Sequence, residues 1–293
     1  MSMTSLQTTL AAASDASDRA EALAALELSR RPGVGAASFR EAIARHGTPS
    51  AALAAWQPPA RTRCKAATAE GLDRGRAWVA SGGLVRWYGC SGYPASLADL
   101  GEPPPVLFVS GDAGVLGAPA VTIVGGREAD RAAVEAARAL GRWCAGRGLA
   151  VVSGAALGVD GAAMEGALDA GGRVVAVLGS GVDVVYPPAH RALLARCAAQ
   201  GAVVSELLPG TPPMRSFFVT RNRILAALGA CTVLVWGRSG SGALVTVRWA
   251  RRLGRPVGAL AWPVAGASDE AWAMGAARVE WAASDWVERQ IAR

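Results

Sequence analysis

The sequence is poor in the residues that enzymes most often use for proton transfer and metal binding. It contains two histidines, His46 and His190, far apart along the chain, and a single lysine, Lys65. The five cysteines form no CxxC pair, and no group of Asp, Glu, His or Cys has metal-ligand spacing. We therefore expect no metal site and no disulfide framework. A catalytic triad would have to use His190, but a lone histidine in a loop is more often a structural hydrogen-bonding group.

The scarcity of lysine also limits the kinds of nucleotide site. The glycine-rich loop Gly237–Gly242 cannot be a Walker phosphate loop, because the GxxxxGK[ST] pattern needs a lysine. Gly179-Ser180-Gly181 begins a GxG pattern, but Val184 stands at the third glycine position, which disfavours a nicotinamide site. From these absences we predict a protein that is not an enzyme and has no catalytic residues and no cofactor.

Long apolar runs and targeting signals are missing as well. No run of about 18 uninterrupted apolar residues occurs, so we expect no membrane-spanning helix and no membrane partner, despite a hydrophobic content of 52%. The start of the chain lacks the basic residues and apolar core of a signal peptide, and we predict a disordered lead over residues 1–18. Scattered cysteines fit a reducing environment, so a cytoplasmic location is expected.

Acidic residues are absent from one long segment that is rich in arginine, between Leu207 and Ser268. The arginines of this segment are Arg215, Arg221, Arg223, Arg238, Arg248, Arg251, Arg252 and Arg255. Guanidinium groups present a fixed fork of donors to phosphate oxygens, and Phe218 in the same segment offers a flat face on which a base can stack. A polyanion therefore suits this segment, and the net charge of +7 permits one. The alternative is a solvated basic surface, which we expect for the four arginines from Arg248 to Arg255.

From Val106 onward, short β-branched runs alternate with alanine-rich stretches of helical character. We predict strands over Val106–Val109, Val121–Val124, Ala150–Val152, Val174–Leu178, Ala202–Ser205, Thr232–Val235 and Val257–Leu260. We predict helices around Arg131–Ala145, Asp160–Ala170, Ala189–Ala199, Asn222–Leu228 and Ala243–Leu253. This alternation indicates an α/β fold with a Rossmann-like, doubly wound, mostly parallel sheet whose strands are buried on both faces.

The segment from Asp18 to about Gly89 has the pattern of helices and turns instead. Its turn Pro32-Gly33-Val34-Gly35 is typical of helix-hairpin-helix modules, although an ordinary turn between two helices fits equally well. We therefore divide the chain into the lead over 1–18, a small all-helical domain over 19–90, and the α/β domain over 91–293.

The ligand crevice of a doubly wound sheet lies beyond the carboxyl ends of its strands. The loops expected there are Gly125-Gly126-Arg127, Ser153-Gly154, Gly179–Gly181, Gly237–Gly242 and the segment leading into Arg221. Small residues in such loops leave the N–H groups of helix N-termini open to anions, although glycine is also simply common in these turns.

The residues around Phe218 indicate which side chains face the expected crevice. Arg215, Phe218 and Arg221 share one face if the segment is helical, whereas Phe218 lies in a loop over the crevice if Thr220 caps the helix. Of the neighbours Phe217 and Phe218, we expect Phe217 to pack inward and Phe218 to face the crevice. Replacing Arg215 or Arg221 is expected to weaken binding of a polyanion with little effect on stability.

The order of several motifs resembles the bacterial DNA processing protein A family, also called DprA or Smf, from the Pro-Gly-x-Gly turn to the C-terminus. A helical module precedes Tyr93-Pro94 and the strand Pro104–Phe108. The later motifs are Ile123–Arg127, Val152–Gly154, Gly158–Asp160, Ala176–Gly181, Tyr186–Pro188, Ser205-Glu206, Pro209–Pro213, Arg221–Ala226 and Ser241–Thr246. Each motif alone is a weak signal, but together and in this order they are specific.

The resemblance implies an extended Rossmann-like domain that binds single-stranded DNA. It further implies a role in natural transformation (DNA uptake) or recombination, in which the protein protects incoming strands and loads the RecA recombinase, and it implies a homodimer. The DNA-binding residues that it implies are Gly125, Gly126, Arg127, Ser153, Gly154, Arg215, Phe218, Arg221, Asn222, Arg223, Ser241, Gly242 and Thr246. Of these, Arg223 is expected to point elsewhere and brace the structure.

The chain departs from the family at several positions near the crevice. Gly126 stands where the family usually has Ser or Thr, Leu157 where an arginine is usual, and Val219-Thr220 where Pro-Arg is usual. Two arginines are thus lost, which predicts a lower affinity than in other members. The chain also ends soon after Val279, where many relatives continue into a winged-helix domain, so we expect a diverged member without that domain.

Two other functions stay open. A nucleotide-processing enzyme of the phosphoribohydrolase type would use a related fold, but its Pro-Gly-Gly-x-Gly-Thr-x-x-Glu loop contains a glutamate, and the corresponding turn Gly240–Thr246 has none. A sensor of small nucleotides would need only an isolated crevice.

Overall fold

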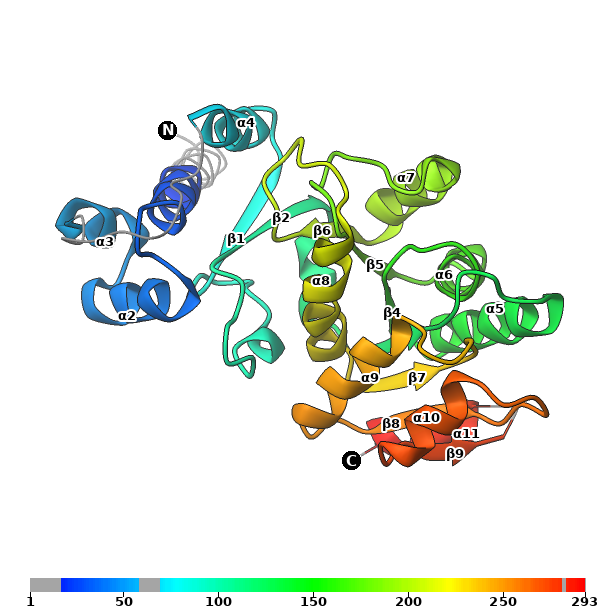
Figure 1. Ribbon diagram of the computed structural model, residues 1–293. Coiled ribbons are helices and arrows are strands. Elements are labelled where there is room, and N and C mark those ends of the chain that lie inside the picture. Colours follow the sequence, from blue (N-terminus) through cyan, green and yellow to red (C-terminus); the bar gives the residue numbers. More distant parts are fainter. Residues whose placement is uncertain (1–16, 58–68, 281–282, 293) are drawn as a thin grey trace, which may run out of the picture.

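The computed structural model describes residues 17–57, 69–280 and 283–292, and Figure 1 shows the elements. Within these ranges one sheet of nine strands has the order β1-β2-β6-β5-β4-β3-β7-β8-β9. The strands are β1 (Leu84–Trp87), β2 (Val106–Gly111), β3 (Ala120–Val124), β4 (Ala150–Ser153), β5 (Val174–Val177), β6 (Ala202–Ser205), β7 (Cys231–Leu234), β8 (Val257–Leu260) and β9 (Ala277–Val279). From β6 to β9 all neighbours are parallel, whereas β1 and β2 form an antiparallel edge beside β6. The predicted α/β fold with a mostly parallel sheet is confirmed.

The sheet is buried on both faces because its strands carry short runs of valine and alanine. Alternate residues of β3 enter opposite cores, with Val121 and Ile123 in one core and Ala120 and Val124 in the other. This alternation follows from the period of two along a strand. The apolar runs seen in the sequence therefore form the central layer of the molecule.

Helices cover both faces of the sheet (Figure 1). One face carries α5 (Arg131–Gly146), α6 (Val159–Asp169), α7 (Arg191–Gln200) and α11 (Ser284–Ile291). The other face carries α8 (Arg215–Leu228), α9 (Ala243–Arg252) and α10 (Ala267–Ala273). The helices α5 and α6 approach closely because Gly141 and Gly166 place no side chain between them. A Cβ on either glycine would overlap the backbone of the opposite helix. Short 3-10 turns lie at Ala95–Leu97, Ala113–Gly117 and Pro188–His190.

The N-terminal part of the described chain is helical and packs against the antiparallel edge of the sheet. A helix over residues 17–29 is followed by α2 (Ala36–His46), α3 (Pro49–Ala55) and α4 (Ala69–Ala80). Leu26 and Phe39 are fully buried in the same core as Phe108 of β2. The helical segment and the sheet are thus joined by a shared core.

Three elements differ from the sequence expectation. The strand β1 lies in the segment expected to contain only helices and turns, and the strand β9 was likewise not anticipated. Both are edge strands of four residues or fewer, and only alternate residues or the last residue are buried, so neither carries a continuous apolar run. The helix α8 begins at Arg215 instead of near Asn222, and its N-cap Met214 supplies no side-chain hydrogen bond that would mark the start.

Two further expectations concern the chain ends and membranes. Most of the predicted lead over residues 1–18 lies outside the described residues, and its last two residues belong to a helix. Each helix in the described ranges is too short or too polar to cross a membrane.

Candidate functional site

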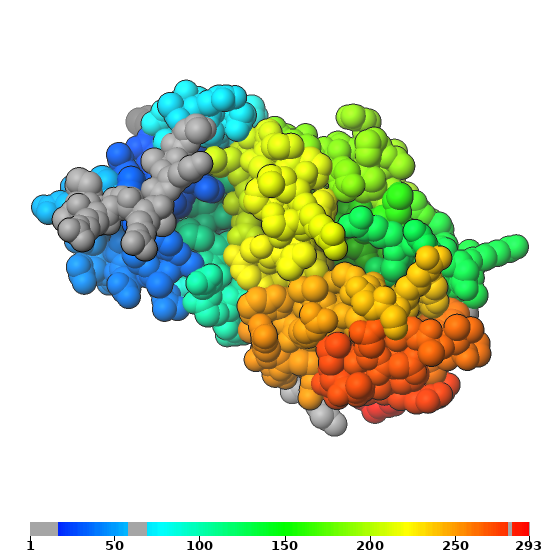
Figure 2. All heavy atoms as spheres, viewed as in Figure 1, coloured from blue at the N-terminus to red at the C-terminus, as the bar shows by residue number. Residues whose placement is uncertain are grey.

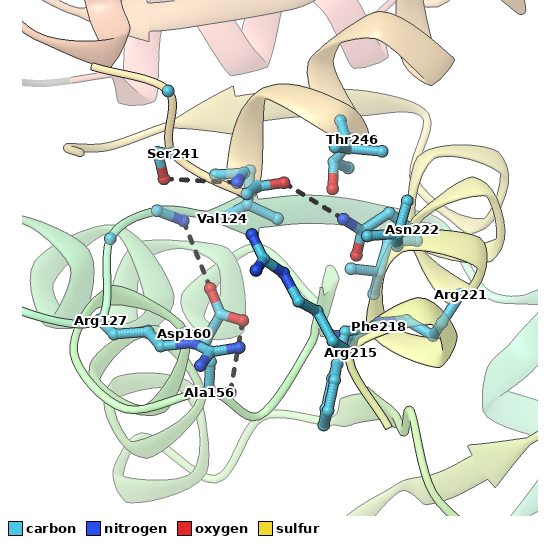
Figure 3. A pocket seen from close by; sticks show the side chains of 18 of the residues that line it. Val124, Arg127, Ala156, Asp160, Arg215, Phe218, Arg221, Asn222, Ser241 and Thr246 are labelled. Atoms are coloured by element: carbon cyan, nitrogen blue, oxygen red, sulfur yellow. Dashed lines mark hydrogen bonds between the residues drawn. The ribbon is translucent and has the colours of Figure 1, made fainter. Parts of the chain in front are cut away.

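A cleft of about 840 Å³ lies beyond the carboxyl ends of the parallel strands. Its walls come from the loops after β3, β4, β5 and β7, the start of α6, and the first turns of α8 and α9. Figure 3 shows Arg127 on one side of it and Arg215, Phe218 and Arg221 on the α8 side. In Figure 2 the yellow surface of α8, the green surface of α5 and α6, and the orange C-terminal surface meet around this hollow.

Positive charge dominates the cleft. Its lining includes Arg127, Arg215, Arg221, Arg238 and Arg248, against the two acids Glu128 and Asp160. Glu128 pairs with Arg238 at 2.9 Å, but both side chains are more than two-thirds exposed, so solvent screens this pair.

Three arginines of the cleft are not paired with any acid that the structure describes. Arg127, Arg215 and Arg248 are exposed and form no ion pair with any described acid. The expectation that Arg248 belongs only to a solvated stripe is corrected, because Arg248 lines the cleft. These three guanidiniums are free to contact a polyanion.

Phe218 faces the cleft and is surrounded by groups that suit a flat ligand. The Cζ atoms of Arg127 and Arg221 lie 5.7 and 5.9 Å from the centre of its ring. The Tyr186 ring lies 5.4 Å away, tilted by 44°. A Cβ on Gly179 would come within 2.6 Å of the Phe218 ring, so a glycine at this position lets the ring settle on the loop after β5. Phe217 lies on the other side of α8 and is half-buried, not fully buried as an inward-facing core residue would be.

Arg221 is the buried member of the cleft. Its side chain is only 5% exposed, and its guanidinium donates a hydrogen bond to the carbonyl oxygen of Val177. Gly154 leaves the space for this guanidinium, which a Cβ there would overlap. Burial lowers the pKa of Arg221 to about 10, although attraction to Asp160 opposes the shift. The guanidinium therefore joins α8 to the loops after β4 and β5.

Asp160 is a buried acid whose charge attracts this guanidinium. It is 5% exposed, and burial raises the pKa of its carboxyl, while Arg221 and backbone donors oppose the rise. The carboxylate accepts from the N–H groups of Gly125 at 3.3 Å and Ala156 at 3.4 Å. Asp160 thus fixes the loops after β3 and β4 around the buried guanidinium. From this burial we expect that replacing Arg221 lowers stability, which differs from the expectation drawn from the sequence.

The N-terminus of α9 forms the wall opposite α5 and α6. Asn222 donates from Nδ2 to the carbonyl oxygen of Gly242 at 3.2 Å, which ties α8 to this turn. Ser241 accepts from the N–H of Ala243 at 3.4 Å. Thr246 is buried, lines the cleft, and its hydroxyl has no hydrogen-bond partner among the described residues. The N–H groups of Leu244 and Val245 donate within the same turn, to the carbonyl oxygens of Ser241 and Gly242 at 3.0 and 3.2 Å, so the turn is closed by its own hydrogen bonds.

Trp236 explains one departure from the family pattern. Gly126 donates its N–H to the carbonyl oxygen of Trp236 at 2.6 Å, and a Cβ on Gly126 would lie 2.8 Å from the Trp236 ring. A serine or threonine at position 126 would collide with this ring. Gly126 therefore leaves the space that the Trp236 ring occupies in the wall of the cleft.

The structure brings most of the residues expected in the site together. Those that line the cleft are Gly125, Gly126, Arg127, Arg215, Phe218, Arg221, Asn222, Ser241, Gly242 and Thr246. Ser153 does not line it: its hydroxyl is buried and donates to the carbonyl oxygen of Ile123 at 2.7 Å. Gly154 is covered by the Arg221 guanidinium. Arg223 points away and binds both carboxylate oxygens of Glu206 at 2.6 Å.

Large cleft residues that sequence reasoning did not assign to the site include Tyr186, Trp236 and Arg248. The motif Tyr186-Pro187-Pro188 was visible, but nothing in it showed that the ring meets Phe218 across 32 residues of sequence. Trp236 lies two residues after β7, and a large aromatic near the carboxyl end of a strand is the signal that could have identified it. Among the described residues, no group of His, Cys, Asp or Glu is arranged to hold a metal ion.

Comparisons with known proteins agree on one family. The family model for DNA recombination-mediator protein A matches residues 85–288, and the model for the DprA-like N-terminal HHH domain matches residues 19–70. A relative from Mycobacterium tuberculosis is 43% identical over 176 residues, which cover 59% of this chain and 45% of the relative. The chain thus matches less than half the length of that relative.

Two solved structures are similar over most of the chain. DNA processing protein A from Streptococcus pneumoniae has a TM-score of 0.66 and 30% identity, covering 73% of this chain and 75% of that one. DNA processing protein A from Helicobacter pylori, described for its mode of binding single-stranded DNA, has a TM-score of 0.60 and 27% identity, covering 64% of this chain and 88% of that one. The family model covers well over half of the chain, and the fold agrees with both structures. The chain therefore belongs to the DNA recombination-mediator protein A family.

Proposed function

We propose that this protein binds single-stranded DNA in the cleft beside α8. The observation that carries the proposal is the Phe218 ring, which lies between the guanidiniums of Arg127 and Arg221 and beside the ring of Tyr186. A base can stack on such an aromatic surface while arginines contact the phosphates on either side. A single strand offers its base faces, whereas a duplex hides them, so the geometry favours single strands.

The available charge of the cleft supports backbone recognition without reading of sequence. Arg127, Arg215 and Arg248 are exposed and line the same cleft. Guanidiniums bind phosphate oxygens whatever the base, and every base has a face that can stack. The protein should therefore bind strands of different sequence with similar affinity.

The relatives support a role for this binding in DNA processing and recombination. The matching family is named for recombination mediation, and the Helicobacter pylori protein is described as binding single-stranded DNA. On this basis we propose that the chain protects single strands during natural transformation or recombination and loads the RecA recombinase. We further propose that it acts as a homodimer in the cytoplasm.

We also propose that the cleft performs no catalysis. Glu128 is paired with Arg238, and Asp160 is buried beside Arg221, where it positions loops. His190 does not line the cleft, and its Nδ1 lies 3.0 Å from the carbonyl oxygen of Ala155. The two acids of the cleft are paired or buried, and His190 lies outside it. The groups that the cleft offers to a ligand are therefore guanidiniums and aromatic rings, which suit binding.

Strand preference is the direct test of the proposed function. A fluorescein-labelled oligothymidylate and a duplex of the same length are titrated with the protein at several salt concentrations, and anisotropy is recorded. We expect tighter binding of the single strand, with an affinity that falls as salt rises, because each phosphate contact releases counterions. Equal affinity for the duplex, or an affinity independent of salt, would overturn the proposal.

A further inference from the structure

A second, smaller pocket of about 290 Å³ lies on the other side of the first turns of α8. It is enclosed by the end of helix 17–29, the start of β2, the loops after β5 and β6, and α8. Arg221 lines both this pocket and the cleft, so the two cavities are separated by the start of α8. Phe218 faces the cleft, and its neighbour Phe217 faces the second pocket.

Positive charge exceeds negative charge around the second pocket. Glu206 is the one acid in its lining, and Arg223 already holds both carboxylate oxygens of Glu206 at 2.6 Å. Arg221 donates to the Val177 carbonyl oxygen and is attracted by Asp160. The Nε atoms of Arg30 and Arg221 are both buried without a hydrogen-bond partner among the described residues, so both guanidiniums keep an unused donor beside the pocket. Burial lowers the pKa of Arg30, with attraction to Glu206 as the opposing cause. An anion in the pocket would offset the desolvation of this guanidinium.

The remaining walls are apolar and include an aromatic ring. Phe217 lies on one side, and Val106 and Leu178 belong to the same lining. A small hydrated ion would leave these carbon surfaces uncovered, whereas a planar, weakly polar group would cover them. The pocket therefore suits an anion that also carries a flat, apolar part.

We propose that this pocket binds one nucleotide, with its phosphate at Arg30 and its base against Phe217. Ligand pockets in proteins begin at roughly 300 Å³, so a single nucleotide is about the largest group that fits. The nucleotide comes either from a free nucleoside monophosphate or from one residue of a bound strand, since both present the same phosphate and base. The proposal does not depend on DNA binding in the cleft, because Arg30 and Phe217 do not line the cleft.

Calorimetric titration with thymidine 5′-monophosphate, ribose 5-phosphate and inorganic phosphate tests the pocket. We expect Arg30→Gln to weaken binding of thymidine 5′-monophosphate about tenfold, because a charge-assisted contact is lost. Phe217→Leu should weaken thymidine 5′-monophosphate but leave ribose 5-phosphate unchanged, because only the former has a base to stack. Arg30→Gln removes a charge whose desolvation outweighs its attraction to Glu206, so its thermal unfolding should show little loss of stability.

Two matched variants control for nonspecific charge effects. Arg31 is adjacent to Arg30 but lies over the Trp56 ring, with its Cζ 5.2 Å from the ring centre, and Arg215 belongs to the cleft. Arg31→Gln should bind thymidine 5′-monophosphate like the wild-type protein, whereas Arg215→Gln reports any binding of the nucleotide in the cleft. The proposal is overturned if Arg30→Gln and Phe217→Leu bind it normally, or if Arg215→Gln alone abolishes binding and so places the nucleotide in the cleft.

Competition with an oligothymidylate distinguishes the two sources of the nucleotide. If the pocket takes a residue of the strand, a saturating oligonucleotide displaces thymidine 5′-monophosphate, and Arg30→Gln weakens oligonucleotide binding too. If the pocket takes free nucleotide, thymidine 5′-monophosphate binds unchanged in the presence of the oligonucleotide. A failure of the proposed function would appear separately, as a protein that binds the monophosphate through Arg30 but no oligonucleotide.

Discussion

The two halves of α8 use the same residue type for different purposes. In residues 215–220 every side chain is exposed or half-buried, and Arg215 and Phe218 line an open cleft. In residues 221–228 almost every side chain is buried: Arg221 donates to the Val177 carbonyl oxygen, and Arg223 is held by Glu206. Arg215 in the first half is available to a ligand, whereas Arg221 and Arg223 in the second half hold neighbouring segments together. Burial, and not charge, decides which role an arginine takes.

The largest effect should come from Arg221→Ala, which removes the guanidinium at the start of the buried second half of α8. This change leaves the Val177 carbonyl oxygen without its buried donor and removes the cation that attracts the buried Asp160 carboxylate, and leaving such groups unsatisfied costs about 3 kcal/mol. Urea denaturation should show this loss in the free energy of unfolding. Adding Asp160→Asn to the variant should restore part of the loss. An Arg221→Ala protein with wild-type stability would show that these contacts are not structural.

Phe218→Ala should have the next largest effect, on binding. The change removes one base-stacking surface, which is worth about 1–3 kcal/mol of single-strand affinity. The ring is half-buried at the cleft, so the midpoint of urea unfolding should change little. Ser216→Ala, in the same helix turn, exposed and outside the cleft lining, serves as the control and should bind like the wild-type protein. A Phe218→Ala variant that is unstable but binds DNA normally would place this ring in the core.

Arg223→Ala should lower stability by about 1–2 kcal/mol and leave DNA affinity unchanged. Its guanidinium and the Glu206 carboxylate are 12% and 18% exposed, so the pair is partly desolvated and its hydrogen bonds are charge-assisted. A double-mutant cycle with Glu206→Gln measures the coupling. If the variant bound DNA more weakly but kept its stability, Arg223 would have to contact the DNA and not serve as a structural residue.

The smallest effect on stability should come from Arg238→Ala. Its ion pair with Glu128 is exposed, with side chains 75% and 71% accessible, and such pairs contribute about 0–1 kcal/mol. Thermal unfolding should therefore barely change. A larger destabilisation would mean that the loop after β7 depends on this contact.

Much of the fold follows from local patterns, while part of the site depends on contacts between distant segments. The buried strands β2 to β8 are visible as apolar runs, and the glycine loops after β3 and β7 mark the ligand edge of the sheet. The edge strands β1 and β9 are too short and too exposed to give such runs.

The roles of individual arginines could not be read from the sequence. Arg215 and Arg221 look equivalent there, but only the packing of α8 against Gly154 and Asp160 shows that Arg221 is enclosed. The stacking of Tyr186 on Phe218 likewise requires the loop after β5 to fold over α8. Both features depend on tertiary contacts that local periodicity does not report.

The salt dependence of DNA binding by Arg215→Ala tests the central claim most directly. Anisotropy titrations of a labelled oligothymidylate are made at several salt concentrations with the wild-type protein and this variant, beside a urea denaturation of each. If the exposed half of α8 contacts the strand, Arg215→Ala loses one phosphate contact, and the slope of log K against log salt becomes about 0.7 less steep. Its free energy of unfolding should stay unchanged. Equal slopes for the two proteins would contradict the account.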